Sequence, residues 1–389
     1  MPNKNEWVNG FGNPTKHSSV HQVIAHVRKA EARRRGAESK AKRPLTEKEF
    51  RKTLEIFCSK NDFVNQIKLP AMCLWQFSLI ARNDDICHFL VDDPKGHPDY
   101  NFALKTKVRW SKNITEERNC PDQILLGSID DSMCMLLQLA IYLESYLSIH
   151  PNARLLFTED TSERAVSRLK NRYRDNLKKI VWNSDEFKSV CDQQDIGFGV
   201  GTHSQRKFPA TYARWQGRTT EEIEIRRRWK QTHGHVVHRY IDVRQEYIDA
   251  KVASKLCVGG PAKYTLKEAV EGIGSQWLYE NVIPSIRARF SNDNRLCDVL
   301  ALPLFYACFL SGENAIPMPD CIKQRVLTQY QSLNLEETQP VQKIALFVQR
   351  RESICRSMNL LISILLGIQT VRFMLEWHSW NIFRVFLFA

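Results

Sequence analysis

The sequence predicts a mostly helical α+β fold with one small antiparallel sheet. Most of the chain carries apolar residues in patterns typical of helices, for example over residues 132–147 and 162–180. Residues 102–110 differ, because apolar side chains alternate there with Lys and Arg, as in a strand. The apolar run 123–126 follows and is predicted to be the return strand of a hairpin.

Composition and charge narrow the class of protein. A chain of 389 residues, 43% of them hydrophobic, can bury a substantial core. Its length exceeds what one core usually holds, so we expect two domains. The formal net charge of +13 favours a polyanionic partner such as a nucleic acid. Charge that serves only solubility is the alternative at this point.

The N-terminal region and the cysteines indicate an intracellular protein. Residues 1–6 lack the apolar core of a signal peptide. The eleven cysteines include no Cys-x-x-Cys pair and lie in apolar stretches, as reduced, buried thiols do. A helix over residues 20–34 leads into a split basic cluster that extends to Arg43. In a eukaryote this cluster suggests import into the nucleus, although a DNA-backbone contact or a solvated helix face fits it equally well.

Local signals place the remaining helices. Thr46 and Glu49 form a capping-box pattern with Leu45 and Phe50 as a hydrophobic staple, so a helix begins there. Thr220 is expected to cap a later helix. Further helices are expected over residues 71–82, 132–147, 162–180, 212–228, 236–256 and much of 264–346.

The last segment, residues 347–389, is an apolar tail of uncertain origin. Its uninterrupted apolar run is shorter than the roughly 20 residues that span a bilayer, and Gln369 and Arg372 interrupt it. A membrane partner is therefore not expected. A buried or docking helix is favoured, and a tail that arose from a disrupted reading frame is the alternative.

Four kinds of side chain that suit attack on a phosphodiester follow one another in the second half of the chain. His203 and Arg206 are one helical turn apart, Trp229 follows a run of arginines, and Tyr240 lies beyond it. Arginine binds the non-bridging oxygens of phosphate, and histidine transfers a proton near neutral pH. Tyrosine is a competent covalent nucleophile once its proton is accepted.

At these residues the chain resembles the tyrosine recombinase (phage integrase) family, in particular its Cre-type and eukaryotic Crypton-like branches. These enzymes carry His-x-x-Arg, then His or Trp, then the nucleophilic Tyr, in the order of His203, Arg206, Trp229 and Tyr240. The interval between Trp229 and Tyr240 is slightly wider than is common in the family. A short loop insertion over residues 232–234 explains the difference.

Two further elements of the family pattern lie upstream. One is an arginine with an acidic residue three positions later in an amphipathic helix, which Arg82 and Asp85 supply. The other is a lysine at the tip of a β-hairpin, which Lys112 supplies. The resemblance covers about residues 42–252 and implies a tyrosine-recombinase-like catalytic domain.

The resemblance implies a mechanism on double-stranded DNA. Tyr240 attacks the scissile phosphate and forms a 3′-phosphotyrosine, while Arg82 and Arg206 bind the non-bridging oxygens. His203 handles the proton of the tyrosine. Trp229 donates its indole N–H to the phosphate.

The remaining roles that the resemblance implies are supporting ones. Lys112 protonates the departing 5′ oxygen, Asp85 orients Arg82, and His235 is the alternative to the tryptophan. No metal and no small-molecule cofactor is needed, because the phosphotyrosine conserves the bond energy. Strand exchange by the family implies a homo-oligomer on DNA, and the lineage implies an origin in a mobile element.

The predicted organisation has four parts: residues 1–43, a remnant of an N-terminal core-binding domain with a basic linker; 44–256, the catalytic domain; 257–346, a helical extension; and 347–389, the tail. Because the N-terminal part is short, a truncated or domesticated DNA-binding protein without recombinase activity is the alternative function. A type I topoisomerase of the tyrosine class is a third.

Other features of the sequence have plainer explanations. His233, His235 and His238 are spaced as metal ligands can be, but no carboxylate or cysteine accompanies them. The glycines of residues 197–201 lack the spacing and the following Lys of a phosphate loop. Pro209 departs from the family pattern and fits only if the helix begins close to it.

Overall fold

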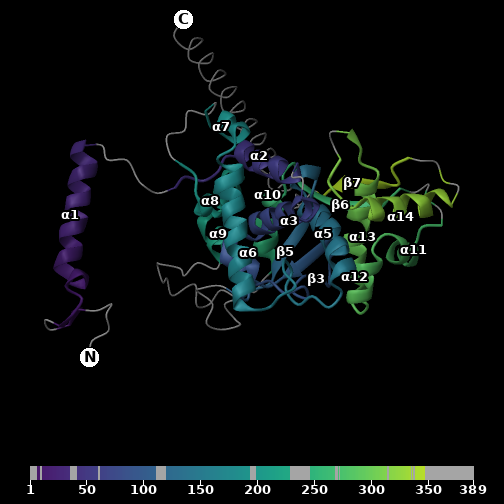
Figure 1. Ribbon diagram of the computed structural model, residues 1–389, viewed down its shortest axis with the longest axis horizontal. Coiled ribbons are helices and arrows are strands. Elements are labelled where there is room, and N and C mark those ends of the chain that lie inside the picture. Colours follow the sequence, from purple (N-terminus) through teal and green to yellow (C-terminus); the bar gives the residue numbers. More distant parts are fainter. Residues whose placement is uncertain are drawn as a thin grey trace, which may run out of the picture.

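The computed structural model describes residues 7–8, 11–35, 42–59, 62–110, 120–192, 199–227, 246–267, 270, 272–312, 315–333, 335 and 338–346. Within them the fold is mostly helical, with a five-stranded antiparallel sheet and a small ribbon of β1 (Trp7–Val8) and β2 (Phe11–Gly12). The predicted α+β class is confirmed. Helix α1 (Ser18–Arg35) stands apart from the rest of the molecule (Figure 1).

The sheet contains the predicted hairpin. Its strands, in spatial order, are β3 (Lys95–Gly96), β4 (Ala103–Thr106), β5 (Gln123–Ser128), β6 (Pro261–Leu266) and β7 (Val341–Ala345). Strands β4 and β5 pair antiparallel with Leu104 opposite Leu125. Strand β4 ends before Lys107, earlier than the predicted end at Trp110. Lys112 lies outside the described residues, so its place at the hairpin tip stays a prediction.

Two strands occur where the sequence pattern predicted helix. Strand β6 pairs with β5 on one side, through Gly127 and Ala262, and with β7 on the other, through Tyr264 and Lys343. The prediction of helix over 264–266 and 341–345 is therefore wrong. Strands β6 and β7 are short, and over so few residues the apolar pattern of a strand cannot be distinguished from that of a helix. Their pairing with neighbouring strands identifies them.

Helix α2 (Glu47–Cys58) begins at the predicted capping box. The backbone N–H of Glu49 donates to Thr46 Oγ1 at 3.2 Å, and the backbone N–H of Thr46 donates to Glu49 Oε2 at 2.8 Å. The next helix, α3 (Phe63–Leu79), starts eight residues earlier than the predicted span 71–82 and ends three residues earlier. Arg82 therefore does not lie within a helix but directly precedes the short helix α4 (Asn83–Cys87).

The remaining helices complete the described part of the fold. Helix α9 is capped by Thr219 rather than Thr220, because the backbone N–H of Glu222 donates to Thr219 Oγ1 at 3.2 Å. The remaining helices are η1 (Pro14–Lys16), η3 (Asp131–Met133), α5 (Met135–Ile149), α6 (Glu163–Asp175), the π-helical turn η4 (Asn176–Val181), α7 (Asp185–Asp192), α8 (Thr202–Trp215), α9 (Thr220–Arg227), α10 (Glu246–Leu256), α11 (Ser275–Asn281), α12 (Pro284–Arg289), α13 (Asn294–Cys308) and α14 (Asp320–Gln331).

Helix α5 lies at the centre of the core. It is apolar around most of its circumference and packs against α3, α12, α13 and β5. One continuous cluster of buried side chains runs from Leu45 to Val341, so residues 44–256 and 257–346 share a core. Helices α2, α6, α8 and α9 gather at one end of the molecule and α11 to α14 at the other (Figure 1).

A buried ion pair between Arg226 and Asp249 connects four elements of the fold. Arg226, which is 1% exposed, pairs with Asp249 on α10 at 2.6 Å and donates to the carbonyl oxygens of Ser78 and Ile124. The backbone N–H of Ile124 donates to the same Asp249 carboxylate at 2.5 Å. Helix α9, helix α10, the end of α3 and strand β5 are thus held by one guanidinium and one carboxylate.

Breaking this pair is expected to destabilise the fold strongly. Arg226→Met leaves the Asp249 carboxylate buried without its cation, so the free energy of unfolding should fall by about 3–5 kcal/mol. Urea unfolding measures it. The matched control is Lys179→Met, which removes an exposed ion pair with Asp175 and should leave stability almost unchanged. A loss at Arg226 no greater than that of the control would contradict the role of this pair.

Candidate active site

Helix α8 presents His203 and Arg206 from its first turn. Its N-terminus is at Gly201, whose backbone N–H donates to Ser204 Oγ at 2.9 Å. A Cβ at Gly201 would come within 2.9 Å of Lys42 Cγ, so a larger residue there would displace the lysine side chain. Arg206 faces inward and is 6% exposed, whereas His203 faces outward.

Aromatic packing fixes the position of α8. Phe208 lies 5.1 Å from Phe50 on α2 and 5.4 Å from Phe77 on α3, measured between ring centroids. Pro209 lies inside the helix, which begins at Thr202 and not close to the proline as expected. The proline is tolerated because it lies on the buried side of a helix that is held by tertiary contacts.

Arg206 is oriented by backbone carbonyls. Its Nε donates to the carbonyl oxygen of Ile80 at 2.9 Å, and its Nη2 donates to that of Arg227 at 3.1 Å. Ile80 has φ 49°, and among the described residues no other non-glycine residue has a positive φ. A left-handed conformation is strained for a β-branched residue. Here it ends α3 and turns the chain toward Arg82, while the Ile80 carbonyl accepts from Arg206.

Arg82 reaches the same region from the turn between α3 and α4. Asp85, which is 2% exposed, accepts a hydrogen bond from the backbone N–H of Arg82 at 3.0 Å. This contact fixes the backbone of the arginine at the start of α4. It does not depend on the Arg82 side chain, so Arg82→Gln should retain it.

These residues meet in a basic cleft of about 530 Å³. Of the predicted site residues, Arg82, His203 and Arg206 all line it. The cations Lys207, Arg214 and Arg227 join them, and among the described lining residues Glu224 is the one acid. Lys112, Trp229, His235 and Tyr240 lie outside the described residues, so their roles stay predictions.

The two arginines at the end of α9, Arg226 and Arg227, lie in different environments. Arg226 is buried in the ion pair with Asp249. Arg227 lines the cleft, and sequence reasoning did not separate it from its neighbours. Burial, together with the nearby charges of Arg206 and Arg82, lowers the pKa of Arg227 to about 9. The cleft therefore concentrates positive charge that a bound anion would stabilise.

Other kinds of site find little support in the part of the chain that the structure describes. No group of three or more His, Cys, Asp or Glu side chains there is arranged to hold a metal ion. Within the same residues, no helix combines the length and the apolar character that crossing a membrane needs. The three histidines at 233, 235 and 238 and the apolar tail fall outside these residues.

No protein-family model matches this sequence, and no curated protein matches it significantly. The resemblance to tyrosine recombinases therefore depends on the motif residues and on their geometry alone.

Anion binding at the cleft is expected to stabilise the protein through Arg227. At pH 7 the buried guanidinium of Arg227 carries a positive charge that destabilises the folded state. A bound sulfate should offset that destabilisation. At sulfate about ten-fold above its Kd, Tm should rise by on the order of 2 °C. Thermal unfolding in sulfate, against chloride of equal ionic strength, measures this rise. Arg227→Met should unfold at a higher temperature than the wild type without sulfate and respond to sulfate less.

The pH dependence follows from the direction of the pKa shift. From about pH 9 upward, release of the Arg227 proton is easier from the folded protein than from the unfolded chain, whose guanidinium keeps its ordinary, higher pKa. Wild-type stability should therefore rise relative to that of Arg227→Met across this window, and the difference between them should shrink. A difference that is unchanged between pH 7 and pH 10 would contradict the assignment.

Proposed function

We propose that this protein is a site-specific DNA recombinase or integrase that cuts and rejoins DNA through a 3′-phosphotyrosine. One observation carries the proposal: Arg82 is far away in the sequence from His203 and Arg206, yet all three line one cleft. They are the described members of the catalytic set that the motif order predicts. A chance match of motifs would give no reason for them to converge.

The chemistry of the cleft supports phosphate as the group that it binds. Two guanidinium groups can bind the non-bridging oxygens of a phosphodiester, where charge develops in the transition state. His203 is exposed at the edge of the cleft and can exchange a proton with an attacking or leaving oxygen. Arg227 adds a third guanidinium, and Lys207 and Arg214 extend the positive surface along α8.

The nucleophile is assigned from the sequence. Trp229 follows Arg227 by two residues, and Tyr240 lies further along the same connection to α10. In the proposed reaction the Tyr240 oxygen forms a bond to phosphorus and the 5′ oxygen leaves with a proton from Lys112. A second strand then reverses the step. The proposed partners are double-stranded DNA and further copies of the chain, and the proposed location in a eukaryote is the nucleus.

Binding to duplex DNA is expected to depend steeply on salt. Each Lys or Arg that neutralises a phosphate releases counterions, so the logarithm of affinity falls linearly with the logarithm of salt concentration. Arg82→Gln should lower affinity and reduce this slope by about one. Fluorescence anisotropy between 50 and 200 mM salt, roughly the range over which such contacts are lost, measures both.

The matched control for this measurement is Arg174→Gln, on the exposed face of α6 and outside the cleft. It should leave the slope unchanged. Affinity of the wild type that stays flat across the salt range would overturn DNA binding through the cleft.

A covalent adduct with nicked suicide substrates is expected to form through Tyr240. Tyr240→Phe removes only the hydroxyl and should abolish the adduct, with DNA affinity within about two-fold of the wild type because other residues bind the phosphates. Tyr247→Phe, seven residues further along, is the control and should keep the adduct. A denaturing gel beside a gel shift measures both properties, and chelator should change neither, because the proposed charge stabilisation comes from arginines.

An adduct that persists in Tyr240→Phe would refute the nucleophile. Wild-type protein that binds DNA but forms no adduct would instead favour the alternative function, a DNA-binding protein without recombinase activity. Relaxation of supercoils without strand exchange would favour the topoisomerase.

A further inference from the structure

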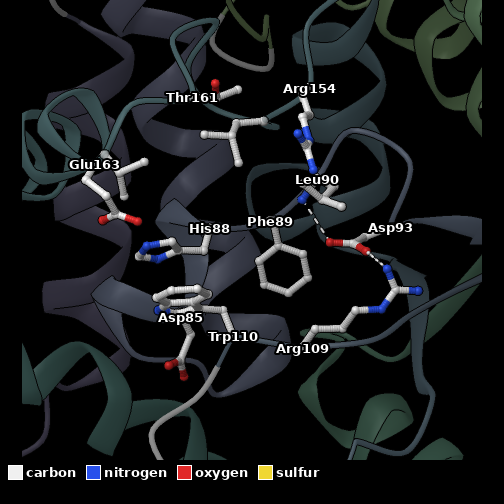
Figure 2. Close-up of a pocket in the computed structure, with 12 residues that line it drawn as sticks. Asp85, His88, Phe89, Leu90, Asp93, Arg109, Trp110, Arg154, Thr161 and Glu163 are labelled. Carbon is white, nitrogen blue, oxygen red and sulfur yellow. Dashed lines mark hydrogen bonds and ion pairs between the residues drawn. The ribbon is translucent and has the colours of Figure 1, made fainter. Parts of the chain in front are cut away.

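A second pocket has a volume of about 410 Å³ and is shown in Figure 2. Asp85, the residue that holds the Arg82 backbone, forms part of its wall. The pocket lies within the size range of small-molecule sites, roughly 300–1,000 Å³. Neither the fold nor the proposed phosphate chemistry accounts for it.

An aromatic pair forms one wall. The rings of His88 and Trp110 are stacked with their centroids 4.0 Å apart and their planes 9° from parallel. Trp110 is 51% exposed, so part of its ring is accessible to a ligand. The rest of the apolar wall is Phe89, Leu90 and other aliphatic side chains (Figure 2). Aromatic rings of this kind are the surfaces on which nucleobases stack.

One ring nitrogen of His88, Nε2, has no hydrogen-bond partner among the described residues. Its Nδ1 lies 2.8 Å from the carbonyl oxygen of Asp84, which can only accept, so Nδ1 carries the hydrogen in the neutral ring. Nε2 is then an acceptor, and it is buried with no hydrogen-bond partner among the described residues. Buried polar atoms are normally satisfied, which points to a donor supplied by a ligand.

Charged groups stand at the edge of the pocket. Arg154 is exposed and projects into it, and no ion pair of its guanidinium occurs within the described part of the chain (Figure 2). Arg109 pairs with Asp93 at 3.1 Å and neutralises that carboxylate. Glu163 lies on the opposite side, where its carboxylate can accept from an exocyclic amine. A planar heteroaromatic ring with an attached anion would match these groups.

We propose that this pocket binds one unpaired nucleotide, with its base against the His88–Trp110 wall and its phosphate at Arg154. The nucleotide could belong to a DNA strand or be free in solution, since both present the same base and phosphate. We favour the strand, because Arg82 and Asp85 place the pocket next to the cleft, and to that extent the inference rests on the proposed function. A base that leaves the duplex near the cut would regain in this pocket the stacking that it loses.

The test compares two duplexes and a free nucleotide on the full chain. Fluorescence anisotropy gives the Kd for a duplex with one unpaired adenine and for the fully paired duplex, and calorimetry gives binding of dAMP. The wild type should bind the duplex with one unpaired adenine about ten-fold more tightly than the fully paired duplex. Such a difference in Kd lies in the lower part of the range of free energies that base–aromatic stacking provides. Trp110→Ala and Arg154→Gln should lose that preference and keep their affinity for the paired duplex.

Two variants control for folding and for the loss of an exposed indole. Trp110→Phe keeps a stacking ring and should keep most of the preference. Trp215→Ala removes another exposed tryptophan, 66% exposed and outside the pocket, and should leave the preference unchanged. Arg154 is a surface residue, so its variant tests the site even if the Trp110 variant folds poorly.

The outcomes separate this inference from the proposed function. Binding of dAMP that needs Trp110 and Arg154, without any preference for the unpaired duplex, would support the pocket with free nucleotide as its source. Affinity for the paired duplex without preference, and without dAMP binding, would overturn the pocket and leave the proposed function intact. No affinity for any duplex would overturn the proposed function, and absence of dAMP binding as well would overturn both.

Discussion

The ion pair between Arg226 and Asp249 is the constraint on which the candidate active site depends. It joins the end of α9 to α10, to the end of α3 and to β5, within an interior where neither charge could remain alone. This ion pair also fixes the position of Arg227, the next residue. The carbonyl oxygen of Arg227 accepts a hydrogen bond from Arg206, and its side chain lines the cleft. The buried arginine thus fixes the one that lines the cleft.

The cleft joins two kinds of arginine environment. Arg206 is held by the carbonyl oxygens of Ile80 and Arg227, which leaves little conformational freedom to be lost when an anion binds. The backbone N–H of Arg82 is held by Asp85. The strain at Ile80 is consistent with a site that the rest of the fold stabilises.

Local signals in the sequence predicted the α+β class, the Thr46–Glu49 capping box and the hairpin of β4 and β5, because each depends on neighbouring residues. The strands β6 and β7 depend on partners far away in sequence, and short apolar segments do not reveal them. In the site, motif order predicted Arg82, His203 and Arg206 at the cleft. The different fates of Arg226 and Arg227 could not be predicted, because burial depends on tertiary packing.

The order of strands also has a consequence for synthesis on the ribosome. Strand β6 has β5 on one side and β7 on the other, and β7 is translated many residues after both. Until β7 emerges, the free edge of β6 presents unpaired backbone groups that can recruit strands from other nascent chains. Lys343 on β7 then completes the sheet and is covered by Tyr264 and Tyr306. Such late closure makes this edge the place where a chaperone would be most useful during folding.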